Sequence, residues 1–184
     1  MEDTDRFIIL TGGPGSGKSS LIQALAQVGY NSAPEAGRAI IQAQVAIGGK
    51  ALPWSDPPAF AELMLSWDMR SHEWARGLKG PVFFDRGIPD VLGYLRLSNV
   101  PVPTHVQTAA RLFRYNTRVF IAPPWPEIFE QDDERKQDFN EAQRTYDAMT
   151  KTYQSLGYTL IELPKESIAD RCTFVLKALK ANGS

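Results

Sequence analysis

The segment Gly12-Gly13-Pro14-Gly15-Ser16-Gly17-Lys18-Ser19 decides the fold of this chain. It satisfies the phosphate-loop pattern G-x-x-x-x-G-K-[ST] without a mismatch, and it follows the apolar run Phe7–Leu10, which is typical of a buried strand. Glycines let successive backbone N–H groups converge on phosphate oxygens, and the start of the following helix adds its positive end. A ligand-free glycine-rich turn would need neither the lysine nor the serine. We therefore predict that residues 12–20, Ser20 included, bind a nucleotide.

Two side chains of this loop have specific expected roles. Lys18 is expected to reach the β- and γ-phosphates of ATP and to act in catalysis, and the Ser19 hydroxyl is expected to bind Mg²⁺. ATP and Mg²⁺ are therefore the predicted cofactors.

Length and composition limit what surrounds this loop. At 184 residues and 43% apolar residues, the chain fits one domain, 1–184, with a real core. The net charge of −1 lacks the basic excess of nucleic-acid binders, so no nucleic-acid partner is expected. No apolar run approaches the roughly 18 residues that span a bilayer, so no membrane association is expected. The acidic N-terminus is unlike a signal peptide, and the single Cys172 suits a reducing compartment, so we expect a cytoplasmic protein.

Apolar runs and helical periodicities alternate along the whole chain. We expect strands at 7–10, 30–33, 81–84, 118–122 and 158–163, and helices at 18–28, 35–47, 57–78, 89–97, 104–115, 139–156 and 167–179. This alternation predicts an α/β fold with a parallel sheet. The aromatic residues at helical spacing are expected to lie in the core rather than to form a ligand platform: Trp67, Trp74, Tyr146 and Tyr153.

Asp85 and Arg86 follow the apolar strand Val82–Phe84, in the form of a Walker B strand end. At the carboxyl edge of a parallel sheet, Asp85 would face the ligand crevice, where it could hold Mg²⁺ or take a proton from an attacking hydroxyl. Arg86 offers a bidentate fork to a phosphoryl group. The alternative is an Asp–Arg pair that only caps a strand-to-helix turn.

Glu35 and Arg38 follow the second expected strand and should lie across the crevice from the phosphate loop. Glu35 could orient or deprotonate an acceptor hydroxyl, and Arg38 could bind an anionic group of the acceptor. An ordinary helix N-terminus would explain Glu35 but not Arg38, because a cation in the first turn is mildly unfavourable.

The charged segment 123–144 lies between the fourth strand and a long helix. Most of its acids are expected to form a solvated face. Arg135 and Arg144 could instead belong to a mobile lid that brings cations onto the transferring phosphoryl group and excludes water.

The order of these motifs resembles the P-loop kinase-like predicted ATPase family, whose relatives include ribosylnicotinamide kinase domains. The matching segments cover nearly the whole chain: Ile8–Ser19, Glu35–Arg38, Phe84–Tyr94, Gln131–Arg135 and Gly157–Leu163. The resemblance implies a three-layer α/β/α P-loop NTPase fold, with a five-stranded parallel sheet in the order 2-3-1-4-5. It also implies phosphoryl transfer or ATP hydrolysis with Mg²⁺, with either Asp85 or Glu35 as the base. The stretch Leu52–Pro58 has no counterpart in the family pattern, so the resemblance does not identify the acceptor.

Two classes of function remain open on the sequence alone. The first is a kinase that transfers phosphate from ATP to a small-molecule acceptor bound by Glu35, Arg38, Asp85 and Arg86. The second is an ATPase or a nucleotide-dependent regulatory protein without such an acceptor. The chain lacks the Asn/Thr-Lys-x-Asp motif by which GTPases read guanine, so guanine specificity is not expected.

Overall fold

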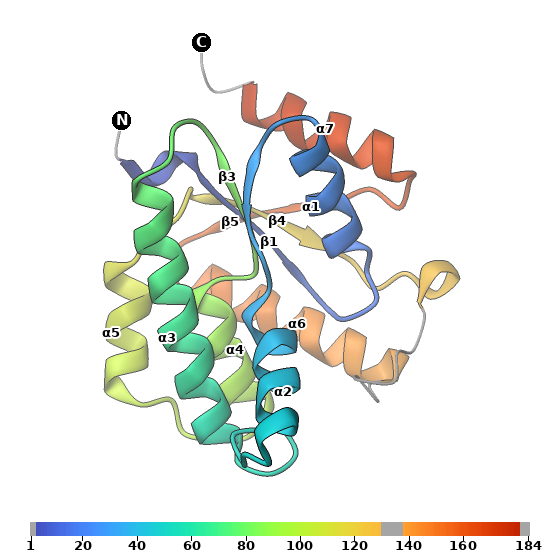
Figure 1. Cartoon of the computed structure of the whole chain (residues 1–184). Helices are drawn as coiled ribbons and strands as arrows, with labels where there is room; N and C mark the ends of the chain where they lie inside the picture. Colours follow the sequence, from blue (N-terminus) through green and yellow to red (C-terminus); the bar gives the residue numbers. More distant parts are fainter. Residues whose placement is uncertain (1–2, 130–137, 181–184) are drawn as a thin grey trace.

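Five parallel strands form the centre of the molecule, in the order β2-β3-β1-β4-β5 (Figure 1). This computed structural model describes residues 3–129 and 138–180. The strands are β1 (Phe7–Gly12), β2 (Asn31–Ala33), β3 (Val82–Asp85), β4 (Arg118–Ala122) and β5 (Thr159–Glu162). The strand order and the parallel direction confirm the predicted sheet.

Helices cover both faces of this sheet (Figure 1). Helices α1 and α7 lie on one side, and α3, α4, α5 and α6 lie on the other, which confirms the three-layer architecture. Helix α2 packs against α3 rather than on the sheet. The helices described are α1 (Lys18–Gln27), α2 (Ala36–Ile47), α3 (Pro57–Arg76), α4 (Ile88–Leu97), α5 (Thr104–Leu112), α6 (Phe139–Ser155) and α7 (Ile168–Lys180).

The central strand β1 is buried on both faces, as the continuous apolar run predicts. Because side chains alternate along a strand, Phe7 and Ile9 join the core cluster formed with α3 to α6. Ile8 and Leu10 join the cluster formed with α1 and α7. Burial of each of these side chains contributes roughly 1.5–3 kcal/mol to the free energy of unfolding. β1 therefore packs against both helical layers, and its carboxyl end fixes where the phosphate loop begins.

The long helix α3 buries a different face from the one that its apolar residues predicted. Its N-terminus is as expected, because the Asp56 side chain accepts a hydrogen bond from the Ala59 backbone N–H at 3.0 Å. However, Trp67 and Trp74 are 39% and 49% exposed, so the prediction that they lie in the core is wrong. The buried face runs one position further round the helix and includes two polar residues: Phe60, Ala61, Leu65, Asp68, His72 and Ala75.

Packing of small residues explains this difference. Ala61 and Ala75 are small and let α3 approach its neighbours closely on this face. Asp68 and His72 lie on the same face of the helix and are therefore buried with them. The His72 imidazole packs edge-on against the rings of Phe7, Phe113 and Tyr115, and its Nε2 lies 2.8 Å from the Arg114 carbonyl oxygen. The tryptophans are left on the outer side of the helix. The other predicted aromatic stripe does pack inward, since Tyr153 is fully buried and Tyr146 packs against the core.

The predicted lid at 123–144 falls partly on residues 130–137, which lie outside the described residues, and Arg135 is among them. The described parts are a short 3₁₀ helix, η2 (Pro126–Ile128), and the start of α6, where the Asp138 side chain accepts a hydrogen bond from the Glu141 backbone N–H at 2.8 Å. Within the described ranges, no helix has the length and apolar character needed to cross a bilayer.

Candidate functional site

The phosphate loop connects β1 to α1 at the carboxyl edge of the sheet. Gly15 and Gly17 have φ values of 67° and 77°, in the left-handed region that glycine adopts without strain. Lys18 turns back into the loop, because its Nζ donates to the Gly13 carbonyl oxygen at 2.6 Å and to the Ser16 hydroxyl at 3.2 Å. The helix N-terminus and the lysine therefore concentrate positive charge around one backbone turn, an arrangement that suits a polyphosphate.

Ser19 and Asp85 meet beside this loop. β1 and β3 are neighbours with Leu10 opposite Asp85, so the start of α1 comes close to the end of β3. The Ser19 hydroxyl donates to Oδ2 of Asp85 at 2.8 Å. The other carboxylate oxygen, Oδ1, is buried and has no hydrogen-bond partner among the described residues.

The environment of Asp85 fits a nearby cation. Burial raises the pKa of its carboxyl, against the opposing effect of the Lys18 ammonium, and the Glu35 carboxylate raises it further. A divalent ion beside Oδ1 would offset the cost of burying this charge. Within residues 3–129 and 138–180, no cluster of three or more His, Cys, Asp or Glu side chains could hold a metal by itself. Mg²⁺ in nucleotide sites is typically held by one or two protein oxygens together with phosphates, and Ser19 and Asp85 match that donor set.

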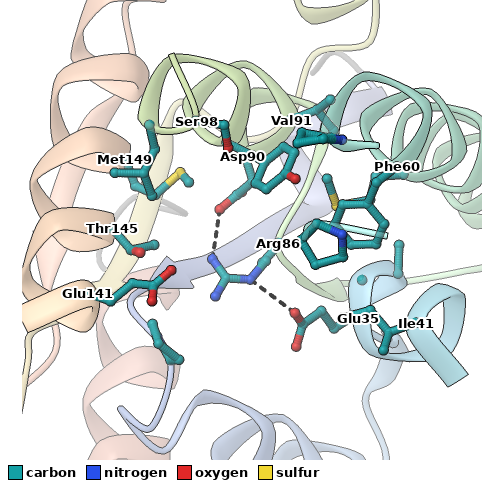
Figure 2. Close-up of a pocket in the computed structure, with 18 of the residues that line it drawn as sticks. Glu35, Ile41, Phe60, Arg86, Asp90, Val91, Ser98, Glu141, Thr145 and Met149 are labelled. Carbon is teal, nitrogen blue, oxygen red and sulfur yellow. Dashed lines mark hydrogen bonds and ion pairs between the residues drawn. The ribbon is translucent and has the colours of Figure 1, made fainter. Parts of the chain in front are cut away.

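Arg86 is the central cation of the site (Figure 2). Its backbone has φ of 72°, which is strained for a residue other than glycine and costs on the order of 1–3 kcal/mol. The contacts of Arg86 offset that strain: its Nε lies 3.4 Å from Oε1 of Glu35, and its Nη1 lies 3.2 Å from Oδ1 of Asp90. Nη1 also donates to the Gly12 carbonyl oxygen at 2.8 Å. The guanidinium is thereby held between α2, α4 and the phosphate loop.

These neighbours also keep Arg86 charged. Burial alone would lower the pKa of Arg86, but the carboxylates of Glu35, Asp90 and Asp85 outweigh it and raise that pKa. Glu35 occupies the residue before α2, yet its side chain makes no capping hydrogen bond to the helix. Its partner is Arg86, so the geometry favours a role in the site over ordinary helix capping.

Asp90 connects the site to the core, and sequence reasoning missed it. Its Oδ1 accepts from the Thr11 hydroxyl at 2.5 Å, and its Oδ2 accepts from the Tyr153 hydroxyl at 2.5 Å and from the Gly87 backbone N–H at 3.0 Å. Together with Arg86, these contacts join β1, β3, α4 and α6. The i,i+4 spacing of Arg86 and Asp90 was the available signal in the sequence.

Arg171 of α7 is a second buried cation that the motifs did not indicate. It is fully buried, and its Nη1 donates to the Ser16 carbonyl oxygen while its Nε donates to the Pro164 carbonyl oxygen, both at 2.8 Å. Its guanidinium carbon lies 5.0 Å from the centre of the Trp125 ring. Burial lowers the pKa of Arg171. This side chain supports the phosphate loop from the C-terminal helix, 155 residues further along the sequence, and no local pattern shows such a contact.

A cavity of about 540 Å³ opens beside the phosphate loop (Figure 2). Of the predicted site residues, the cavity is lined by Pro14, Glu35, Arg86 and Arg144. Arg38 is exposed and is not among the lining residues, and neither is Asp85. The rest of the lining is largely apolar: Ala36, Gly37, Ile41, Pro53, Trp54, Pro57, Phe60, Met64, Val91, Tyr94, Leu97 and Met149.

The close-up in Figure 2 shows how α2, α4 and α6 surround this cavity. Arg86 points toward Glu35 on one side and Asp90 on the other, while Glu141 and Thr145 project from α6. Glu35, Arg86 and Pro14 of the phosphate loop therefore line one cavity that is large enough for a small organic molecule.

Comparisons with known proteins agree with this architecture. A family model described as AAA domain matches residues 7–171. The structure is similar to a deoxyadenosine kinase from M. mycoides, with a TM-score of 0.70 and 13% identity over 95% of this chain and 99% of that one. It is also similar to a shikimate kinase from Acinetobacter baumannii, with a TM-score of 0.60 and 16% identity over 98% of this chain and 96% of that one.

A thymidylate kinase from Ehrlichia chaffeensis has a TM-score of 0.62 and 18% identity over 94% of this chain and 97% of that one. The comparison with curated protein sequences found no match. At these identities the likeness to the three solved structures shows the fold.

Proposed function

Because the chain belongs to the AAA domain family of P-loop NTPases, on a match over residues 7–171, we propose that it is a Mg-dependent kinase that transfers the γ-phosphoryl group of ATP to a hydroxyl of a small molecule. The structural neighbours named above are a deoxyadenosine kinase, a shikimate kinase and a thymidylate kinase, and the acceptors in these names are the first compounds to try.

One observation carries this proposal: the cavity that begins at the phosphate loop and is walled by Pro14, Glu35 and Arg86. Hydrolysis of ATP needs only a water molecule at the γ-phosphate. A mostly apolar chamber of about 540 Å³ at that position suits a second substrate instead. Glu35 lines this chamber and lies 3.4 Å from Arg86, which supports the proposal that its carboxylate accepts the proton of an attacking hydroxyl.

The residues divide into two groups in the proposed mechanism. The loop Gly12–Ser20 would bind the phosphates, with Lys18 reaching the β- and γ-phosphates, and Ser19 and Asp85, which lie in hydrogen-bond contact, would hold Mg²⁺. Mg-ATP supplies the phosphoryl group, and ADP leaves when the bond between the γ-phosphorus and the bridging oxygen breaks. Glu35 accepts the proton of the attacking hydroxyl, because it lines the cavity whereas Asp85 does not. Arg86 orients the Glu35 carboxylate through their contact at 3.4 Å and would face the transferred group.

The remaining predicted cations have proposed roles at the rim. Arg144 lines the cavity from α6 and would contact the transferring phosphoryl group when ligands are bound. Arg135 retains its proposed lid role. Arg38 is exposed and outside the cavity lining, so a contact with the acceptor would require α2 or the acceptor to extend beyond the cavity.

Release of ADP from Mg-ATP tests the proposal. The protein is incubated with Mg-ATP alone and then with nucleosides, ribosyl compounds, shikimate-like alcohols and amino sugars. A kinase releases ADP much faster with one of these compounds, whereas equal release with and without every compound indicates an ATPase, and nucleotide binding without turnover indicates a regulatory protein.

A pair of lysine variants controls this assay. Lys18→Ala should lower acceptor-dependent ADP release by about 10²–10³ because it removes a cation from the developing charge. Lys177→Ala removes an exposed lysine of α7 and should leave the rate unchanged. Equal rates in the wild type and Lys18→Ala would contradict the proposed mechanism.

A further inference from the structure

Asp68 is a buried carboxylate that has no role in the proposed phosphoryl transfer. It lies in the middle of α3, is 9% exposed and lines the cavity. Within the described parts of the chain, no hydrogen bond or ion pair reaches its carboxylate. An unpaired carboxylate in such a position is costly, so a protein whose only requirement was packing would carry an apolar residue there.

Arg86 and Asp90, two other charged groups of the cavity wall, already have partners among the described residues. Arg86 pairs with Glu35 and with Asp90, and Asp90 also accepts hydrogen bonds from core residues. Arg144 is exposed on α6. Burial raises the pKa of Asp68 well above its ordinary value, and Asp90 and Glu35 raise it further, against the opposing effect of the Arg86 guanidinium.

The walls near Asp68 suit an apolar or ring-shaped ligand body. Phe60 and Met64 precede Asp68 on the same helix and line the same cavity. The rings of Phe60 and Tyr94 pack edge-to-face with their centres 5.4 Å apart. Trp54 lines the cavity while remaining 64% exposed, so it is available to contact a ligand ring at the rim.

Taken together, these features define what the cavity can bind. We propose that Asp68 is a specificity-determining residue, and that the acceptor is a neutral or cationic ring-containing alcohol whose amino group donates a hydrogen bond to Asp68 while its hydroxyl faces Glu35. This inference rests on the proposed kinase function. Anionic acceptors such as carboxylates and monophosphates are disfavoured, because the carboxylates of Glu35, Asp68 and Asp90 line the chamber and Arg86 is already paired. The other lining cation, Arg144, is exposed and is assigned to the transferring phosphoryl group in the proposed mechanism.

Matched pairs of acceptors test the inference. Adenosine is compared with purine riboside, which lacks the amino group, and glucosamine is compared with glucose; adenosine monophosphate represents the anionic class. In whichever of these pairs is phosphorylated, the wild type should prefer the amino compound by about 10-fold or more in kcat/KM. The reason is that only the amino compound can donate a hydrogen bond to the Asp68 carboxylate. Adenosine monophosphate should be a poorer acceptor than adenosine.

Two variants complete the experiment. Asp68→Asn removes the charge and should reduce the preference for the amino compound to less than about 3-fold, chiefly through a higher KM. Asp147→Asn alters an exposed carboxylate of α6 that is not among the cavity-lining residues, and it should keep the wild-type preference. An unchanged preference in Asp68→Asn, or a wild type that prefers purine riboside, glucose or the monophosphate, would overturn the inference.

Calorimetric titration separates this inference from the proposed function. The same compounds are titrated into protein that holds Mg²⁺ and a non-hydrolysable ATP analogue, so binding is measured without turnover. Tighter binding of the amino compound that is lost in Asp68→Asn supports the role of Asp68 even if no compound is phosphorylated, in which case only the kinase proposal fails. Absence of any difference in binding between the two proteins overturns the role of Asp68, whether or not phosphorylation occurs.

Discussion

Replacing Asp90 by asparagine tests how much the hydrogen bonds of one buried carboxylate contribute to the stability of the site. The carboxylate accepts from four groups: the hydroxyls of Thr11 and Tyr153, the Arg86 guanidinium and the Gly87 backbone N–H. A hydroxyl can turn to accept from an amide, but the Arg86 and Gly87 donors cannot. They approach different oxygens, Oδ1 and Oδ2. Whichever way the new amide is oriented, its NH₂ group faces one of these two donors.

The magnitude follows from this count. One buried N–H donor is left without an acceptor, which costs about 1–3 kcal/mol, and the remaining hydrogen bonds lose the strength that the charge gives them. Among the described residues, Arg86 then keeps Glu35 as its ion-pair partner. A loss of about 3 kcal/mol in the free energy of unfolding corresponds to a fall in Tm of about 6–12 °C for a chain of this size.

Thermal unfolding followed by circular dichroism measures the effect. Asp147→Asn is the matched control, since Asp147 is exposed and its described hydrogen bond is to Gln143 one helical turn away. Its Tm should change by less than about 2 °C. If Asp90→Asn unfolds within that same interval of the wild type, the network around Asp90 does not have the role assigned to it here.

Three further predictions concern the site and its supports. Glu35→Gln should lower kcat by about 10²–10⁴ because it removes the proposed base. Asp85→Asn should mainly raise the Mg²⁺ concentration needed for half-maximal rate. Identical Mg²⁺ profiles for Asp85→Asn and the wild type would exclude Asp85 as a metal ligand. Burial raises the pKa of Asp68, so protonation of Asp68 favours the folded state, and the wild type loses stability as the pH rises through that pKa. The free energy of unfolding of Asp68→Asn relative to the wild type, measured in urea, should therefore grow from pH 4 to pH 8. A difference that is independent of pH would contradict this cause. Gly13→Ala should lower the free energy of unfolding by about 1–3 kcal/mol, since a Cβ there would lie 2.4 Å from the Ala142 carbonyl oxygen, and an unchanged urea midpoint would show that the loop and α6 can separate freely.

The phosphate loop and the sheet were predictable from sequence because their signals are local. Gly12 to Ser19 form one continuous motif, and β1, β3 and β4 carry short apolar runs, whereas β2 (Asn31–Ala33) has a weaker signal. The end of β3 also followed from its pattern, and Asp85 does lie next to Ser19. The pairing of Glu35 with Arg86 required only that both follow strands at the same sheet edge.

The remaining contacts depend on packing between distant segments. Asp90 and Tyr153 meet across α4 and α6, and Arg171 reaches the loop from the last helix. On α3, hydrophobicity predicted that Trp67 lies in the core. The small residues on the face one position further round the helix let the neighbouring elements approach, and Asp68 is buried there instead. The neighbouring sequence does not indicate which polar residue of a helix will line a cavity.

The central claim is that a phosphoryl group passes from ATP to an organic acceptor rather than to water. Incubation with ATP radiolabelled in its γ-phosphoryl group, followed by separation of the products, measures this directly. The proposal predicts that the label appears on the acceptor in step with ADP formation and that Lys18→Ala slows both by about 10²–10³. Label found only as inorganic phosphate, at a rate that no acceptor changes, would contradict it.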